Sequence, residues 1–106
     1  MSRGVDEIMD RPYTIDEIKK ISVPIAQKYG VEKLALFGSY ARGEQKSTSD
    51  IDFLIELGNI RGLEFYSFIL NLENEFGVNV DVLTYDTLKE PIYNDFVDKE
   101  VILYER

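Results

Sequence analysis

The sequence contains no cysteine and no histidine among its 106 residues. Without cysteine the chain has no disulfide framework and no thiolate zinc site. Without histidine it lacks the commonest general base and cannot form a serine triad. Any catalysis must therefore use carboxylates, lysine, arginine, hydroxyl groups, or a hard metal ion held by oxygen.

Positive charge is also scarce, because 12 Lys and Arg face 20 Asp and Glu, giving a net charge of -8. Binding to DNA or RNA requires a basic surface, so we expect no direct nucleic-acid binding and a basic protein partner instead. No secretory pattern opens the chain and no apolar run reaches membrane-spanning length, which predicts a cytoplasmic protein without membrane contact. The length and the 44% hydrophobic content predict a single domain over residues 1–106.

Helical and strand patterns alternate after an irregular lead-in at residues 1–12. Thr14 and Glu17 form a capping box ahead of a helical pattern that ends at Gly30. Further helices are predicted over residues 63–76 and from Pro91 onward. The core face of the helix at 63–76 is predicted to hold Phe65, Ile69, Leu72 and Phe76. Strands are predicted at 33–37, 50–57 and 78–83, and a short apolar run stands at 101–104. This order predicts an α/β fold, with helices covering a small sheet.

Two aspartates interrupt the strand predicted at 50–57. Asp50 and Asp52 are two residues apart, so they share one face of a strand with Cα atoms about 6.6 Å apart. The helix at 63–76 should return the chain so that the strand at 78–83 pairs in parallel. If Asp81 meets the same face, three carboxylates converge and require cations to offset their repulsion. Two Mg²⁺ ions suit such an all-oxygen site, with Mn²⁺ as a substitute.

Gly38 and Ser39 follow the strand at 33–37 and open a short helical turn. A helix start next to glycine can bind phosphate through backbone N–H groups. The Ser39 hydroxyl and the Arg42 guanidinium can add hydrogen bonds to the same phosphates. Each feature also has an ordinary structural role, such as a turn, a solvated strand edge, or a pair between Arg42 and Glu44. Together they indicate phosphoryl or nucleotidyl transfer.

The full pattern is Gly38-Ser39, ten intervening residues, Asp50-Ile51-Asp52, and then Asp81. This pattern resembles the nucleotidyltransferase superfamily typified by DNA polymerase beta, and within it the minimal nucleotidyltransferase (MNT) domains. The stretches "LFGSYARGE" and "EVILYE" also look like MNT proteins, so the resemblance covers nearly the whole chain after residue 12.

The resemblance implies a nucleotidyltransferase fold with a small mixed sheet of three to four strands. It implies that Asp50 and Asp52 bridge two Mg²⁺ ions and that Asp81 completes the ion that activates the acceptor hydroxyl. Nucleotide binding is assigned to Gly38, Ser39, Arg42 and Ser49, with ATP as the substrate.

MNT proteins are commonly encoded beside a HEPN protein, an RNA-cleaving toxin, and transfer AMP onto a toxin tyrosine with release of pyrophosphate. The resemblance therefore implies an AMP-transferring antitoxin in a hetero-oligomer with a HEPN toxin. We expect the acceptor to be presented by another molecule, since the sequence shows no second domain to bind it. Two alternatives stay open. The chain is either a binding module that masks a basic partner stoichiometrically, or a small-molecule nucleotidyltransferase that acts as a dimer.

Overall fold

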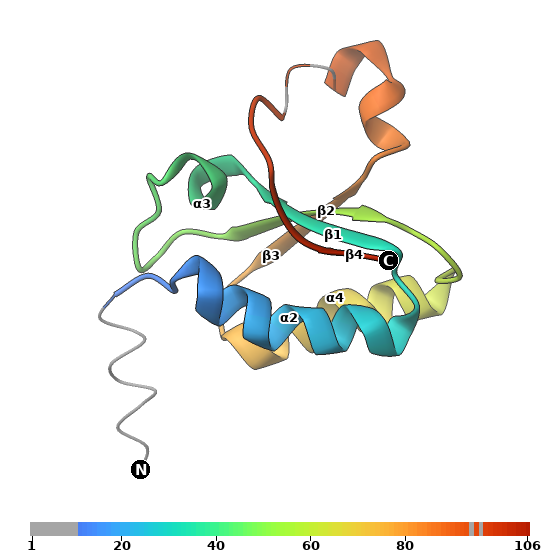
Figure 1. The fold of residues 1–106 in the computed structure, drawn as a ribbon, viewed down its shortest axis with the longest axis horizontal. Coiled ribbons are helices and arrows are strands. Elements are labelled where there is room, and N and C mark those ends of the chain that lie inside the picture. The colour runs from blue at the N-terminus through green and yellow to red at the C-terminus, as the bar shows by residue number, and fades with distance from the viewer. Residues whose placement is uncertain (1–10, 94, 96) are drawn as a thin grey trace.

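The computed structural model describes residues 11–93, 95 and 97–106. Within these residues three α-helices and four strands follow one another (Figure 1). They are α2 (Ile15–Tyr29), β1 (Lys33–Phe37), α3 (Gly38–Arg42), β2 (Ile51–Glu56), α4 (Leu63–Phe76), β3 (Val80–Thr84) and β4 (Val101–Glu105), with the 3-10 turns η1 (Thr87–Lys89) and η2 (Pro91–Tyr93) before β4. The predicted α/β fold is confirmed. The lead-in predicted at residues 1–12 falls almost entirely outside the described residues.

The four strands form one mixed sheet in the order β3-β2-β1-β4. Strand β1 is antiparallel to both β2 and β4, whereas β2 and β3 are parallel. Helix α4 is the crossover between the two parallel strands, as the sequence predicted. This crossover sets the register in which Asp81 of β3 lies beside Asp52 of β2.

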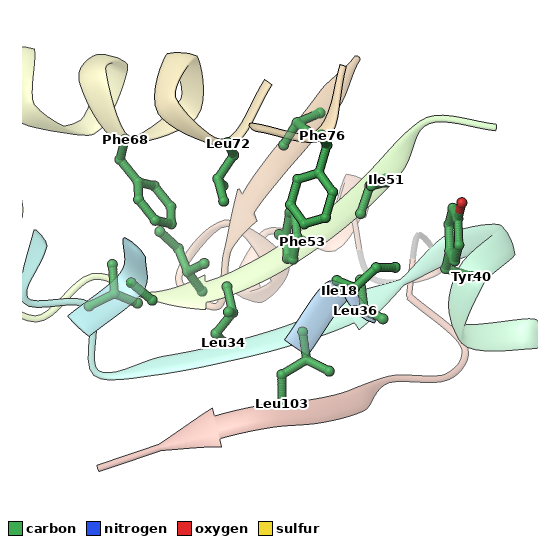
Figure 2. Close-up of a cluster of buried hydrophobic side chains, with 14 of the residues drawn as sticks. Ile18, Leu34, Leu36, Tyr40, Ile51, Phe53, Phe68, Leu72, Phe76 and Leu103 are labelled. Carbon is green, nitrogen blue, oxygen red and sulfur yellow. The ribbon is translucent and has the colours of Figure 1, made fainter. Parts of the chain in front are cut away.

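Helices α2 and α4 cover one face of the sheet (Figure 1). Figure 2 shows side chains that are buried between these two helices and the sheet. They include Ile18 of α2, Leu34 and Leu36 of β1, Ile51 and Phe53 of β2, Phe68, Leu72 and Phe76 of α4, and Leu103 of β4. The alternate positions of β1 and β2 point to the opposite face of the sheet. That face carries a second, smaller cluster built on Ala35, Phe37 and Leu54, against which Leu83, Tyr85, Leu88 and Val97 pack.

The capping box at the start of α2 is present in full. The Glu17 N–H donates to Thr14 Oγ1 at 3.1 Å, and the Thr14 N–H donates to Glu17 Oε1 at 2.9 Å. Gly30 ends the helix in a left-handed conformation with φ of 79°. Ser22 is the buried polar residue of α2, and its hydroxyl donates to the Ile18 carbonyl at 2.6 Å.

Several sequence-based boundaries and positions need correction. Strand β2 begins at Ile51, so Asp50 lies just before it, and β3 begins at Val80 rather than at residue 78. On α4 the most deeply buried line runs through Phe68, which the sequence analysis missed, while Phe65 and Ile69 flank it partly buried. Phe65 and Phe68 are three residues apart and lie on the same apolar side of the helix, so the sequence allows either to be the more deeply buried. The arrangement of the neighbouring α2 decides between them.

The helix predicted from Pro91 is wrong, since the structure has the single 3-10 turn η2 there. Residues 94 and 96 of this prediction lie outside the described residues. Most helical stability comes from packing an apolar face. Of the described residues between η2 and β4, Val97 is the one that packs against a cluster. Among the described residues, no helix is long and apolar enough to cross a membrane.

Candidate active site

Asp52 and Asp81 lie on the face of the sheet away from α2 and α4, and Asp50 directly precedes β2. Asp52 sits in β2 between Asp81 of β3 and Phe37 of β1, its partners in the two registers. Phe37 belongs to the second cluster. Asp52, its register partner, therefore lies on the same face of the sheet as that cluster. Asp52 is half-buried, whereas Asp50 and Asp81 are exposed. The crossover therefore brings Asp52 and Asp81 together, as predicted.

Gly38 packs directly against the Asp52 carboxylate. Its φ of 71° is a left-handed conformation that favours glycine. A β-carbon at this position would overlap Asp52 Oδ2 and lie 3.1 Å from Asp52 Cγ. Glycine is therefore required for two independent reasons, backbone conformation and the space that the carboxylate occupies. The sequence analysis assigned Gly38 to the phosphate side of the site and did not foresee this contact.

The electrostatics of the site centre on Asp52. Burial, and then the neighbouring carboxyl groups of Asp81 and Asp50, raise the pKa of Asp52 to about 6, while the Arg42 guanidinium opposes this rise. The raised pKa means that negative charge on Asp52 is held at a cost in free energy. A cation bound between these carboxylates would relieve that cost.

Ser39 and Arg42 lie on α3, which begins at Gly38 directly after β1. The first N–H groups of a helix have no acceptor within the helix, so those of Gly38 and Ser39 can serve a bound phosphate. Arg42 Nε donates to Glu44 Oε1 at 3.0 Å, which is the structural pairing that the sequence left open. Its Nη1 also lies 3.9 Å from Asp98 Oδ1, a neighbour that no local sequence signal could reveal.

Ser49 closes the loop that leads into β2. Its hydroxyl accepts the Lys46 N–H at 2.8 Å, and its own N–H donates to the Lys46 carbonyl at 3.0 Å. These bonds give Ser49 a role in shaping the turn before Asp50. Its assignment to nucleotide binding stays a prediction, as do those of Gly38, Ser39 and Arg42.

The donor chemistry of the site fits a hard divalent cation. Carboxylate oxygens are the ligands that Mg²⁺ prefers, and Asp52 is already flanked by a second carboxylate. Within the part of the chain that the structure describes, no three His, Cys, Asp or Glu side chains form a ready metal-binding group. Asp50 is exposed and lies just before β2. Convergence of all three aspartates stays a prediction.

Comparison with known proteins places this geometry in a family. The model of the nucleotidyltransferase domain family matches residues 15–104 of the chain. The chain belongs to this family. A candidate protein adenylyltransferase of Methanocaldococcus jannaschii is 47% identical over 89 residues, which cover 79% of this chain and 96% of that protein. The protein adenylyltransferase MntA of Thermococcus cleftensis is 34% identical over 84 residues, covering 74% and 85% of the two chains.

Solved structures agree with this assignment. A candidate minimal nucleotidyltransferase has a TM-score of 0.67 and 26% identity, covering 83% of this chain and 91% of its own. An MNT antitoxin structure, solved with the tri-AMPylated HEPN toxin of Shewanella oneidensis, has a TM-score of 0.62 and 14% identity over 84% of this chain and 71% of its own. At that identity it shows a shared fold alone. The protein is thus an enzyme of the nucleotidyltransferase class, built on the minimal form of the fold.

Proposed function

We propose that this nucleotidyltransferase is an antitoxin that transfers AMP from ATP to a tyrosine hydroxyl of a HEPN toxin in the cytoplasm. One observation carries the proposal. The half-buried Asp52 lies between the backbone of Gly38 and its register partner Asp81, with its pKa raised to about 6. A purely structural residue gains nothing from this surplus of negative charge. Relatives named protein adenylyltransferase, and a related fold seen with an AMPylated HEPN toxin, support the choice of AMP and of acceptor.

The reaction needs the acceptor hydroxyl on one side of the α-phosphorus of ATP and the leaving pyrophosphate on the other. The acceptor oxygen forms a bond to the α-phosphorus of ATP, and the bond from that phosphorus to the bridging oxygen breaks. Pyrophosphate leaves with the bridging oxygen, and the hydroxyl proton passes to the Asp81 carboxylate. The N–H groups at Gly38 and Ser39 hold the phosphates that leave.

Asp50, Asp52 and Asp81 are the residues that would hold Mg²⁺ or Mn²⁺. When bound, the cation supplies charge neutralisation for the reacting phosphate and for the acceptor oxygen. Gly38 keeps the Asp52 carboxylate in a fixed position, since the backbone closes one side of it.

The test is transfer of label from alpha-labelled ATP to a co-purified HEPN protein in the presence of Mg²⁺. We expect Asp52→Asn to abolish transfer, because it removes the central anionic ligand at nearly constant volume. Asp16→Asn is the matched control, since Asp16 is exposed on α2 and, of the described residues, forms its ion pair with Lys20. Undiminished transfer by Asp52→Asn would rule out the assignment.

A pair of glycine variants tests the contact behind Asp52. Gly38→Ala and Gly43→Ala both place a side chain at positive φ, 71° and 76°, so both carry a similar backbone strain of about 1–3 kcal/mol. A β-carbon at Gly43 meets nothing within 4 Å, whereas one at Gly38 overlaps the Asp52 carboxylate. We expect both variants to lose stability and Gly38→Ala alone to lose transfer in the folded protein.

A further inference from the structure

A groove of about 880 Å³ lies next to the carboxylate site, at the end of the sheet. We name it the end groove. Its walls come from the chain before α2, the loop before β2, and the end of α4 with the residues that follow. They include Tyr13, Ser47, Asp50, Asn74, Phe76 and Val78. Asp50 thus belongs both to the groove and to the predicted catalytic carboxylates, so the groove borders the predicted active site.

The floor of the end groove is fixed by buried contacts. The Tyr13 hydroxyl donates to the Phe76 carbonyl at 2.6 Å, and the two rings meet edge to face at 5.1 Å between centroids. The Tyr13 N–H donates to the Tyr40 hydroxyl at 3.2 Å. Figure 2 shows Phe76, Ile51 and Tyr40 toward the same end of the core. A ligand therefore meets a preformed surface and needs little rearrangement of the protein.

The charge of the groove selects its occupant. Of the described residues that line it, Asp50, Glu73 and Glu75 are acidic and Arg11 alone is basic. The Arg11 guanidinium makes a bidentate pair with Glu17, at 2.9 and 2.8 Å. Helix α4 also ends here, with no basic residue in its last turn, and a helix C-terminus carries partial negative charge. A polyphosphate or a nucleic acid is repelled by such a surface, and a basic polypeptide is attracted.

We propose that the end groove binds a basic segment of the acceptor protein and presents its hydroxyl to the catalytic site beside Asp50. The inference rests on the proposed function and names the route by which the acceptor enters. A volume of this size accommodates several side chains. Gly38 and Ser39 do not line the groove, which leaves them for the triphosphate. Attacking and leaving oxygens must lie roughly in line across the phosphorus, so the acceptor and the leaving phosphates need separate binding places.

The test compares two charge reversals on the same helix. Glu75 lines the groove, whereas Glu64 is exposed in the first turn of α4 outside it. The probe is a fluorescein-labelled peptide with one tyrosine flanked by lysines, compared with the same peptide carrying glutamates, and binding is followed by anisotropy at low salt. We expect the wild type to prefer the lysine peptide. Glu75→Lys should weaken its binding about tenfold and Glu64→Lys by no more than about twofold.

A second pair separates the groove from the general acidity of the chain. Asn74→Trp fills the groove without changing charge, and Ser67→Trp places the same side chain on an exposed position of α4 outside it. We expect only Asn74→Trp to weaken binding of the lysine peptide, with the Mg²⁺-ATP-induced rise in melting temperature unchanged in both. Equal effects within each pair overturn the inference.

The peptide measurement needs no turnover, so the two proposals fail separately. Groove-dependent binding without AMP transfer to any HEPN protein overturns the proposed function alone. AMP transfer whose KM for the HEPN protein is the same in Glu75→Lys and Glu64→Lys overturns the end groove alone.

Discussion

The surroundings of Asp52 disfavour the ionised form of its carboxyl group. Its pKa rises from 3.8 to about 6 through burial and the nearby Asp81 and Asp50. Because the folded pKa exceeds the unfolded one, the folded state binds more protons between these values. The metal-free protein therefore loses stability as the pH rises from about 4 to above 6.

We predict that metal-free Asp52→Asn is more stable than the wild type at pH 7.5. The shift in pKa corresponds to a cost of about 2 kcal/mol, after allowance for the solvent that screens this half-buried group. For a domain of this size that is on the order of 10 °C in melting temperature. Thermal melts of both proteins in a chelator, at pH 7.5 and pH 4.5, give the measurement. The difference should shrink at the lower pH, where the wild-type carboxyl is protonated.

Binding of Mg²⁺-ATP should reverse this order. A ligand that binds only the folded state stabilises it by about 2.7 kcal/mol at a hundredfold excess over its dissociation constant. The wild type should gain this stabilisation, and Asp52→Asn should lose most of it. If metal-free Asp52→Asn is less stable than the wild type, the Asp52 carboxylate has a structural role instead, accepting hydrogen bonds from nearby backbone N–H groups.

Elements with strong local signals could be predicted from the sequence. The capping box at Thr14 and Glu17 fixes the start of α2, and Gly30 and Gly77 end α2 and α4 in left-handed conformations. The strand β1 and the turn α3 follow from an apolar run that stops at Gly38. In each case the deciding residues lie within a few positions of the boundary.

Features set by distant contacts could not be predicted. The burial of Phe68 depends on where α2 lies, and the pairing of β4 with β1 depends on strands that are far apart in sequence. The ion pair between Arg42 and Asp98 likewise joins two segments that are far apart in sequence. By contrast, the parallel pairing of β2 and β3 could be predicted from the crossover, and strand alternation allowed Asp52 and Asp81 to share one face. The exact register, which places the two side by side, could not be predicted.

The start of α2 should also govern part of the stability in acid. Hydrogen bonds from the Arg11 side chain, and then from the Thr14 backbone, lower the pKa of Glu17 to about 2. This lowered pKa contributes stability above the unfolded pKa near 4.5, which is lost as the pH falls through about 2.

We predict that Glu17→Gln lowers the free energy of unfolding by about 1 kcal/mol at pH 7, a value discounted because the side chain is 34% exposed. Glutamine can keep the hydrogen bonds of the capping box, so the loss of stability measures the contribution of the negative charge. Urea unfolding from pH 7 to pH 2 should show the difference narrowing below pH 5. Asp16→Asn should change the stability little at any pH, because the side chains of Asp16 and its partner Lys20 are 72% and 77% exposed. A difference that does not vary with pH would contradict the role of the charge.

The net charge of the chain and the geometry of its site favour different modes of action for the proposed antitoxin. A chain of net charge -8 can bind a basic ribonuclease quickly and mask it one to one. The Asp52–Asp81 pair is unnecessary for masking and costs stability, so it favours catalysis.

Titration of a HEPN ribonuclease with this protein separates the two modes. Even an enzyme that turns over about once per second modifies many molecules within minutes. With Mg²⁺ and ATP, we therefore predict that wild-type protein well below equimolar protects a labelled RNA from the toxin. Without ATP, or with Asp52→Asn, protection should require equimolar protein, because a blocker acts once. Asp16→Asn changes the net charge equally and should behave as the wild type. If the wild-type endpoint stays at one to one with ATP present, the acidic surface neutralises the toxin by binding, and the carboxylate site serves another acceptor.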